Sequence, residues 1–287
     1  MPDEGAAPTP RNQFSFSRVK TFHQCPLRYR YRYLKGLKEA FRSVESYMGS
    51  VIHDVLEWLY NERQKRESPD LQRALTTLAD RWGAGLVDEV TVIRCSDRID
   101  DYLVTAREIL ERFHRETFTR DRSTTVALEK RLNRKLSDSV VFTGFADRIG
   151  RTENGRLFVV DYKTSKREGD AAEFSEGLQA PLYAACAMAR DVDTEALAGY
   201  HYLRHGTTSW QSVDEERAAA LMGRFRELAD EASAATEFEP RPGILCAWCG
   251  FNQMCPAAEV PAALSGGLEK AREIADRSPT LYEHEPR

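Results

Sequence analysis

The chain has 287 residues and a formal net charge of −4, with 41% hydrophobic and 30% charged residues. This length and composition support one large domain or two small ones with a substantial core. No apolar run approaches the ~20 residues of a membrane span, and residues 1–13 contain prolines but no apolar signal segment. We therefore expect a soluble, cytoplasmic protein with a disordered N-terminal tail, no membrane partner and few disulfides.

The first half of the chain has the periodicity of helices. Ser17 is a suitable N-cap for a short helix that ends near Gln24, and Pro26 can open the next helix. Apolar residues then recur at helical spacing in three longer segments. These predicted helices span residues 46–64, 70–87 and 99–118.

From residue 123 onward the pattern changes to that of strands. Asn154-Gly155 is a tight-turn signal between two apolar runs, so it predicts an antiparallel hairpin. The segment near Trp210 is expected to pair with the strand before it. The order of elements indicates one α/β domain with a hairpin in its sheet. Strands are predicted for residues 124–136, 140–151, 156–164 and 197–204, and helices for residues 179–189 and 214–235.

Two acids and a lysine fall near the ends of neighbouring predicted strands. Asp161 and Lys163 are two residues apart, so they share one face of a strand that the preceding valines mark as buried. Asp147 lies on the neighbouring strand. Two carboxylates suffice to hold Mg²⁺ over a phosphate, and a lysine beside the metal can orient or deprotonate water. The alternatives are a surface ion pair of Asp147 with Arg148 and an exposed Asp161–Lys163 pair.

Three further residues are candidates for the same site. His53 lies in the apolar register of the helix predicted over residues 46–64, where it is either a core histidine or a further metal ligand. Gln179 and Tyr183 are four residues apart on one helix, so both face the same way. Together they can hold a nucleotide or position the attacking water.

A basic segment near the N-terminus interleaves arginines with Tyr29, Tyr31 and Tyr33. Alternating cations and aromatic rings suit a phosphate backbone and stacked bases. The alternative is a solvated helix whose tyrosines face the core. The candidate DNA-binding residues are Arg18, Lys20, Arg28, Arg30 and Arg32.

Cys246, Cys249 and Cys255 have the spacing of metal ligands in a short loop. Three such thiols in a reducing compartment indicate zinc or an iron–sulfur cluster. Cys25 is the leading candidate for the fourth ligand, because a proline follows it as a proline follows Cys255. Residue spacing alone leans toward a structural Cys₄ zinc site.

Taken together, four short motifs resemble those of the RecB-like branch of the PD-(D/E)XK nuclease superfamily. Ala146 stands where the superfamily's name has proline, and this branch uses the Gly-x-x-Asp form instead. The resemblance implies a restriction-endonuclease-like core, which is a mixed central sheet flanked by helices, with a helical lobe before it. The motifs are Gly49-Ser-Val-Ile-His53, Gly144-Phe-Ala-Asp147, Asp161-Tyr-Lys163 and Gln179-Ala-Pro-Leu-Tyr183.

The same resemblance implies a site for Mg²⁺ or Mn²⁺. Its ligands would be His53, Asp147 and Asp161, assisted by the backbone carbonyl of Tyr162. Lys163 would be the catalytic amine.

The resemblance also implies roles for residues around the metal. Gln179 and Tyr183 would contact DNA or order the site during catalysis. Glu129 matches an acid often found on the preceding strand of such nucleases. Its alternative is a surface charge among basic neighbours.

An upstream cysteine combined with a three-cysteine loop is similar to the iron–sulfur staple of AddB-type RecB-like nucleases. This implies a [4Fe–4S] cluster that joins the termini, bound by Cys25, Cys246, Cys249 and Cys255, with structural zinc as the alternative. The implied nuclease domain spans residues 14–264, followed by a C-terminal tail over 265–287. Within the domain, the helical lobe spans 14–122, the nuclease core 123–238 and the cysteine loop 239–264.

The function implied is that of a metal-dependent deoxyribonuclease in DNA repair or recombination, acting as an exonuclease on single-stranded DNA or DNA ends. A second hypothesis is a catalytically inactive subunit that binds DNA ends in a helicase–nuclease complex. A third is a structural iron–sulfur or zinc protein with an unrelated hydrolase role. The sequence has no P-loop motif for ATP, so unwinding would need a separate helicase partner.

Overall fold

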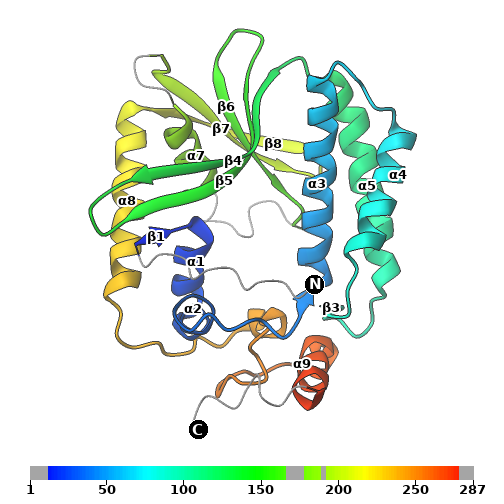
Figure 1. The fold of residues 1–287 in the computed structure, drawn as a ribbon, viewed down its shortest axis with the longest axis vertical. Helices are drawn as coiled ribbons and strands as arrows, with labels where there is room; N and C mark the ends of the chain where they lie inside the picture. Colours follow the sequence, from blue (N-terminus) through cyan, green and yellow to red (C-terminus); the bar gives the residue numbers. More distant parts are fainter. Residues whose placement is uncertain (1–11, 166–177, 189–191, 278–287) are drawn as a thin grey trace.

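The computed structural model describes residues 12–165, 178–188 and 192–277. A central sheet of six strands is covered by helices on both faces (Figure 1). This is a mixed α/β architecture that fits the expected restriction-endonuclease-like core. One face carries α1 (Phe16–Gln24), α7 (Gln179–Ala187) and α8 (Glu215–Ala234), and the other carries α3 (Val44–Gln64), α4 (Leu71–Gly85) and α5 (Ile99–Glu116).

The sheet is mainly antiparallel. Strands β4, β5 and β6 form a meander, β7 runs parallel to β6, and β8 pairs antiparallel with β7. Gly155 has a φ of +80° in the turn between β5 and β6, which confirms the hairpin predicted from Asn154-Gly155. These strands are β4 (Thr124–Lys135), β5 (Val141–Arg151), β6 (Leu157–Lys163), β7 (Glu195–Tyr202) and β8 (Thr207–Asp214).

The N-terminal end of the described chain belongs to the sheet. Strand β1 (Gln13–Phe14) runs parallel to the start of β5, and the amide of Val141 donates to the carbonyl of Asn12. The prediction of a disordered tail is therefore wrong for residues 12 and 13. Residues 1–11 of that predicted tail lie outside the described residues.

Shorter elements lie between these helices and strands. They are α2 (Pro26–Tyr29), which continues as the π-helical η1 (Arg30–Leu34), the strand pair β2 (Arg42–Ser43) and β3 (Val90–Thr91), and the 3₁₀ helices η2 (Phe118–Arg120), η3 (Ile244–Trp248) and η4 (Ala262–Leu264).

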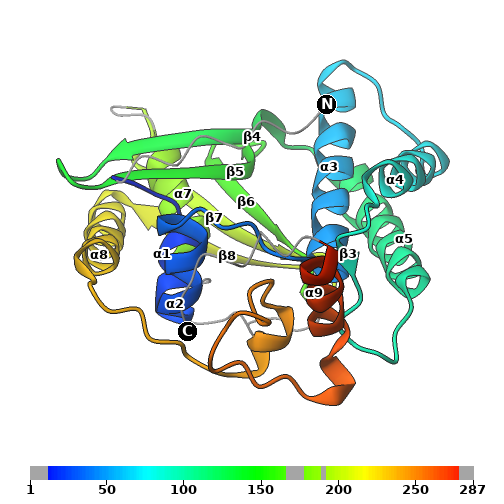
Figure 2. The same cartoon turned by 60° about the horizontal axis from the view of Figure 1, so that its bottom comes forward.

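The predicted C-terminal tail contains a packed helix. Helix α9 (Gly266–Arg277) lies beside η3 (Figure 2), and its Ala271 is buried with Phe41, Ile93 and Ala247. The tail prediction is therefore wrong for this segment, whose few apolar residues find partners only from distant parts of the chain. None of the described helices has the length and apolar character needed to cross a membrane.

Strand β6 separates two cores, which we call the α7-side core and the α3-side core after the helices that cover them. Val159 belongs to the α7-side core, whereas Val160 and Tyr162 belong to the α3-side core. This alternation is that of a strand buried on both faces. It directs Asp161 and Lys163 toward the α7 side.

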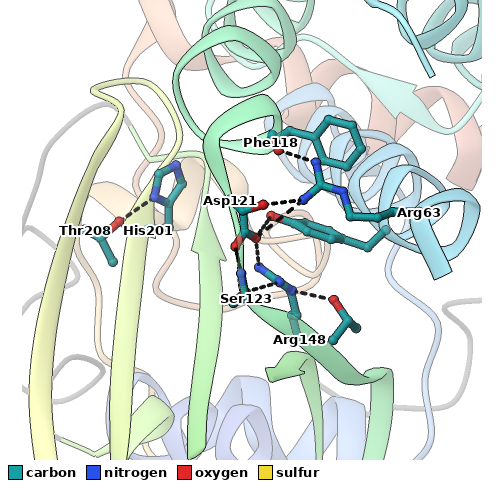
Figure 3. A network of polar contacts seen from close by, with 9 residues as sticks. Arg63, Phe118, Asp121, Ser123, Arg148, His201 and Thr208 are labelled. Atoms are coloured by element: carbon teal, nitrogen blue, oxygen red, sulfur yellow. Dashed lines mark hydrogen bonds and ion pairs between the residues drawn. The ribbon is translucent and has the colours of Figure 1, made fainter. Parts of the chain in front are cut away.

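The buried Arg148 on β5 connects the meander to the α3-side helices through polar and ring contacts (Figure 3). Arg148 is 4% exposed, and its guanidinium lies 3.7 Å from the centre of the Tyr60 ring. Its Nη1 lies 2.7 Å from Oδ2 of Asp121, its Nη2 donates to Oγ of Ser123 and its Nε donates to Oγ1 of Thr125. Each of the three nitrogens of this buried guanidinium therefore has a partner.

We predict that Arg148→Met lowers the free energy of unfolding by about 3–5 kcal/mol, because the buried Asp121 would lose its closest cation and keep only Arg63, whose Nη1 lies 3.9 Å from its Oδ2. Urea denaturation followed by circular dichroism measures this loss. The matched control is Arg115→Met, whose side chain is 66% exposed in a surface pair with Glu116 and should cost less than about 1 kcal/mol. Equal losses in the two variants would contradict a structural role for the Arg148 network.

Candidate active site

The candidate site lies where the pairing of β5 with β6 ends. The two strands pair only from Arg148 to Arg151, opposite Val160 to Leu157. Beyond that point the amide of Tyr162 donates instead to Oδ2 of Asp147, at 2.8 Å. The carbonyl of Tyr162 lies 3.0 Å from Nε2 of His53 on α3. The backbone of Tyr162 is thus satisfied by two side chains of the candidate site rather than by a strand.

The side-chain alternation of β5 breaks at Asp147. Ala146 belongs to the α7-side core, whereas Arg148 stacks on Tyr60 of the α3-side core, although residues two apart on a regular strand share a face. The alternative prediction of a surface Asp147–Arg148 ion pair is therefore wrong, because the arginine is buried on another acid, Asp121.

Three possible metal ligands gather at this break. His53, Glu129 and Asp147 each offer a ligand atom within 4.8 Å of the other two, and Nδ1 of His53 lies 3.5 Å from Oδ2 of Asp147. Glu129 has a φ of +41°, in the left-handed region that residues other than glycine rarely adopt. Such strain is typical of functional positions, where the surrounding structure holds it.

The electrostatics of this group fit a divalent cation. Burial lowers the pKa of His53, but the nearby carboxylate of Asp147 outweighs this and raises it to about 9. Burial and the charge of Asp147 together raise the pKa of Glu129 to about 7. Burial also raises the pKa of Asp161, with a further contribution from Asp147. Crowded carboxylates that resist ionisation gain from a cation between them, and oxygen ligands with one imidazole suit Mg²⁺ or Mn²⁺.

Asp161 and Lys163 form the second half of the site. Nζ of Lys163 lies 2.5 Å from Oδ2 of Asp161 and donates to Oε1 of Gln179 at 3.0 Å. Nε2 of Gln179 donates in turn to the hydroxyl of Tyr183 at 3.5 Å. Asp161 is 4% exposed, so the alternative of an exposed surface pair is wrong. Nζ of Lys163 also lies 5.5 Å above the ring of Tyr200, a contact that the sequence pattern did not suggest.

Two glycines allow the motifs to meet. A Cβ on Gly144 would lie 2.8 Å from the ring of Tyr183, which is too close for a real contact. A Cβ on Gly49 would lie 3.2 Å from Oγ1 of Thr164, directly after Lys163. The glycine of the Asp147 motif is therefore explained by the close approach of Tyr183, and the glycine of the His53 motif by that of Thr164.

The four predicted cluster ligands line one cavity of about 360 Å³. Cys25, Cys249 and Cys255 pack at the edge of a small apolar cluster, and burial raises the pKa of Cys249 to about 11. Among the described cysteines, no three sulfur atoms lie within 4.8 Å of one another, so they surround the cavity rather than meet at a point. Cys95 is exposed at a different place and does not line this cavity.

The basic N-terminal segment differs from the predicted DNA surface. Arg18 is 3% exposed and its Nη1 donates to the carbonyl of Gln13, so the prediction that Arg18 binds DNA is wrong. Tyr29 and Tyr31 are buried, as the alternative interpretation of this segment predicts. The structure places the other four cations differently: Arg28 and Arg32 lie beside Glu39, Arg30 lies half-buried on η1, and Lys20 lines a groove.

That groove has a volume of about 650 Å³ and opens beside Lys163. Its lining includes Arg94, Arg204 and Trp248, which sequence reasoning missed. In the sequence, Trp248 stands between two predicted cluster ligands, Cys246 and Cys249. This position is the only feature of the sequence that indicated a functional role for Trp248. The two arginines lie in irregular segments whose pattern carries no such signal.

Comparison with known proteins agrees with the motifs. Residues 13–256 match the family model of the PD-(D/E)XK nuclease superfamily. Over 190 residues, or 64% of this chain, the sequence is 29% identical to proteins from Streptococcus agalactiae of serotypes Ia, V and III that are named as one subunit of an ATP-dependent helicase/deoxyribonuclease. The match covers 17% of the length of these relatives.

A solved structure titled "Crystal structure of SSO0001" is also similar, with a TM-score of 0.39 and 16% identity over 87% of this chain and 88% of the other. The stronger finding is the family match, which extends over most of the described sheet and both helical layers. The chain belongs to the PD-(D/E)XK nuclease superfamily, and its motifs are those of the RecB-like branch.

Proposed function

We propose that this chain is a metal-dependent DNA nuclease of repair or recombination, acting on single-stranded DNA or DNA ends. One observation carries the proposal: the His53–Glu129–Asp147 group and the Asp161–Lys163 pair lie on either side of the backbone of Tyr162. A candidate cation site and a half-buried amine are thereby held next to each other. Phosphodiester hydrolysis needs both charge stabilisation and an oriented water.

The contacts of each residue suggest its role in this reaction. His53, Glu129 and Asp147 would hold the cation, with Asp161 as a further ligand because its buried carboxylate gains from a second positive charge. A bound divalent ion supplies Lewis acidity toward the phosphate and an activated water. Lys163, fixed by its bond to Gln179, would orient that water and offset charge on the phosphate. Tyr183 holds Gln179 in place.

The cysteine cavity supports a second part of the proposal, a [4Fe–4S] cluster. Four thiols from both ends of the fold face one cavity, which is the ligand set of such a cluster. In a tetrahedral zinc site with Zn–S bonds of about 2.3 Å, the sulfur atoms would lie about 3.8 Å apart. No three of these sulfur atoms lie within 4.8 Å of one another, which leaves room for the larger cluster, and the resemblance to AddB-type nucleases favours it over structural zinc.

The competing function is an inactive subunit that binds DNA ends within a helicase–nuclease complex. Catalysis is supported by the approach of His53, Glu129 and Asp147 to within 4.8 Å of one another and by the Asp161–Lys163 pair next to them. The curated relatives are named as helicase/deoxyribonuclease subunits. We therefore propose a separate helicase as a partner that supplies single strands.

The test is metal-dependent cutting of end-labelled oligonucleotides by the full chain. We expect cleavage with Mg²⁺ or Mn²⁺ and none with a chelator. Glu129→Gln should raise the Mn²⁺ concentration for half-maximal cutting by about 10–100-fold, because it removes a ligand charge. Calorimetric titration with Mn²⁺ should show the same loss of affinity. Glu153→Gln, in the turn between β5 and β6, is the control and should change neither. Equal cutting with and without the chelator would refute a metal-dependent nuclease.

A further inference from the structure

A second cavity lies on the face of the sheet opposite to Asp161 and Lys163. It has a volume of about 560 Å³, and its lining includes the side chains of Phe158, Val160 and Tyr162, which alternate with those two residues along β6. The lining includes none of the three residues that could hold the cation, nor Lys163. A cavity of this size can enclose a small organic ligand. Such a ligand can bind here without contacting the candidate active site.

One wall of this cavity is aromatic. Trp210 on β8 is 46% exposed, and its ring lies edge-to-face with that of Phe158, with 5.9 Å between the ring centres. A Cβ on Gly199 would lie 2.6 Å from the Trp210 ring, so the glycine leaves room for this ring against β7. Leu197 also lines the cavity. A large, half-exposed aromatic ring with apolar neighbours suits the face of a flat ligand ring.

A buried histidine contributes to the polar part of the lining. His201 is 4% exposed, and its Nδ1 lies 2.6 Å from Oγ1 of Thr208. In Figure 3 this pair lies beside the Asp121–Arg148 network, and all four residues line the cavity. Nε2 of His201 is buried and has no hydrogen-bond partner among the residues that the structure describes. Burial lowers the pKa of His201 to about 4, so the imidazole is neutral at pH 7. A buried polar atom without a partner destabilises a fold, and a ligand that supplies the partner would remove this cost.

The charges around the cavity leave one cation uncompensated. Both acids in the lining are paired with arginines: Oδ2 of Asp121 lies 2.7 Å from Nη1 of Arg148, and Oε1 of Glu116 lies 3.2 Å from Nη2 of Arg115. Arg120, which is exposed on η2, lines the same cavity and takes part in no ion pair within the described ranges of the chain. A guanidinium at the solvent side of a cavity attracts an anionic group and can donate two hydrogen bonds to it.

We propose that this cavity binds a nucleoside monophosphate, with its base against Trp210 and beside the His201–Thr208 pair, and with its phosphate toward Arg120. A nucleobase is flat, and its edge carries both hydrogen-bond donors and acceptors, so it can pair with either neutral tautomer of His201. A plain aromatic ring lacks this edge, and inorganic phosphate lacks the ring. The site is separate from the proposed nuclease site, and binding to it does not depend on cutting.

Isothermal titration calorimetry of the full chain with dAMP and with dCMP tests this assignment. A chelator is present, so that no divalent ion holds the nucleotide at the candidate active site. We expect one site, and we expect inorganic phosphate to bind it at least about 10-fold more weakly than the preferred nucleotide. Trp210→Leu should weaken nucleotide binding by about 5–100-fold, the contribution of one base on an aromatic ring. The matched control Trp58→Leu changes a half-buried tryptophan of α3 outside the cavity and should bind as the wild type does.

The phosphate contact has its own readout. The nucleoside without its phosphate should bind the wild type at least about 3-fold more weakly than the nucleotide. Arg120→Gln should weaken nucleotide binding by the same factor and leave nucleoside binding unchanged. Arg107→Gln, at an exposed position of α5 outside the cavity, should change neither affinity.

His201→Phe separates a binding role from a structural one. It keeps a ring in the buried position and removes both nitrogens, so we expect weaker binding of nucleotide and nucleoside by about 2–10-fold. The melting temperature should not fall, because the unpartnered Nε2 is removed as well. A lower melting temperature with unchanged nucleotide affinity would show that His201 serves only the fold and would overturn its place in the site.

Two other results would overturn the nucleotide site. One is that neither nucleotide binds the wild type, or that both bind Trp210→Leu as tightly as the wild type. The other is equal affinity for nucleotide and nucleoside, which would exclude the phosphate contact and with it this class of ligand. The assay of Mn²⁺-dependent cutting tests the nuclease proposal separately, since neither Trp210 nor Arg120 belongs to the candidate active site.

Discussion

Lys163→Met should lower the rate constant for DNA cleavage by about 10³-fold or more, while the protein remains folded. The ammonium group contacts both Asp161 and Gln179, and its removal takes away the cation that we propose offsets charge on the phosphate. It also leaves the buried carboxylate of Asp161 without its partner, which favours the protonated and weakly ligating form. We expect Asp161→Asn to cause a loss of similar size, since it removes a ligand charge directly.

Single-turnover cleavage of an end-labelled single strand at saturating Mn²⁺ measures this loss. Saturating metal separates a defect in the chemical step from a defect in metal binding. Lys135→Met is the matched control, because this side chain is 68% exposed and pairs only with Asp138. A Lys163→Met protein that melts like the wild type and cuts at the same rate would remove Lys163 from the mechanism.

The elements of the fold were predictable where local pattern and environment agree. The alternating apolar residues of β6 and the Asn154-Gly155 turn specify a buried strand and a hairpin, and both are found. The predicted helices of the α3-side layer also form, because each has a continuous apolar stripe. In contrast, β1 depends on a partner far away in the sequence, and no local signal marks it. Helix α9 has apolar residues at helical spacing, but its burial depends on distant residues such as Phe41 and Ile93.

The same distinction between local pattern and tertiary context applies to the candidate site. The same-face relation of Asp161 and Lys163 follows from strand geometry, and the contact between them is found. The break in β5 at Asp147 and the left-handed backbone of Glu129 do not follow from any periodicity. The break in β5 lies where β5 and β6 separate, which leaves the backbone of Tyr162 to be satisfied by side chains. Glu129 lies on β4 between Leu128 and Lys130, which pair with Arg148 and Ala146 on either side of the break.

Arg18 shows how a charge pattern can mislead. It stands in a run of basic residues, yet its guanidinium lies 4.5 Å above the ring of Phe14 and donates to the backbone of β1. A cation so placed acts in packing, and only the tertiary structure distinguishes it from a cation that binds phosphate. The cationic side chains beside Lys163 instead come from segments distant from one another in the chain.

Cys246→Ala should abolish the proposed iron–sulfur cluster and lower the melting temperature by at least about 10 °C. Cys25 and Cys246 are 221 positions apart (246 − 25), and both line the cavity below α2. By analogy with a disulfide, a constraint that closes such a long loop contributes about 5 kcal/mol to stability. The burial that raises the pKa of Cys249 means that these thiols are poorly solvated as thiolates unless a metal compensates their charge.

Anaerobic purification, iron analysis and visible absorption near ~400 nm provide a readout independent of nuclease activity. The control is Cys95→Ser, since Cys95 is exposed and lies outside the cavity. It should keep the iron, the colour and the melting temperature of the wild type. If the wild type is colourless and binds one zinc ion, the four cysteines would hold structural zinc in place of the cluster. Iron retained at the wild-type level in Cys246→Ala would exclude this cysteine as a ligand of the proposed cluster.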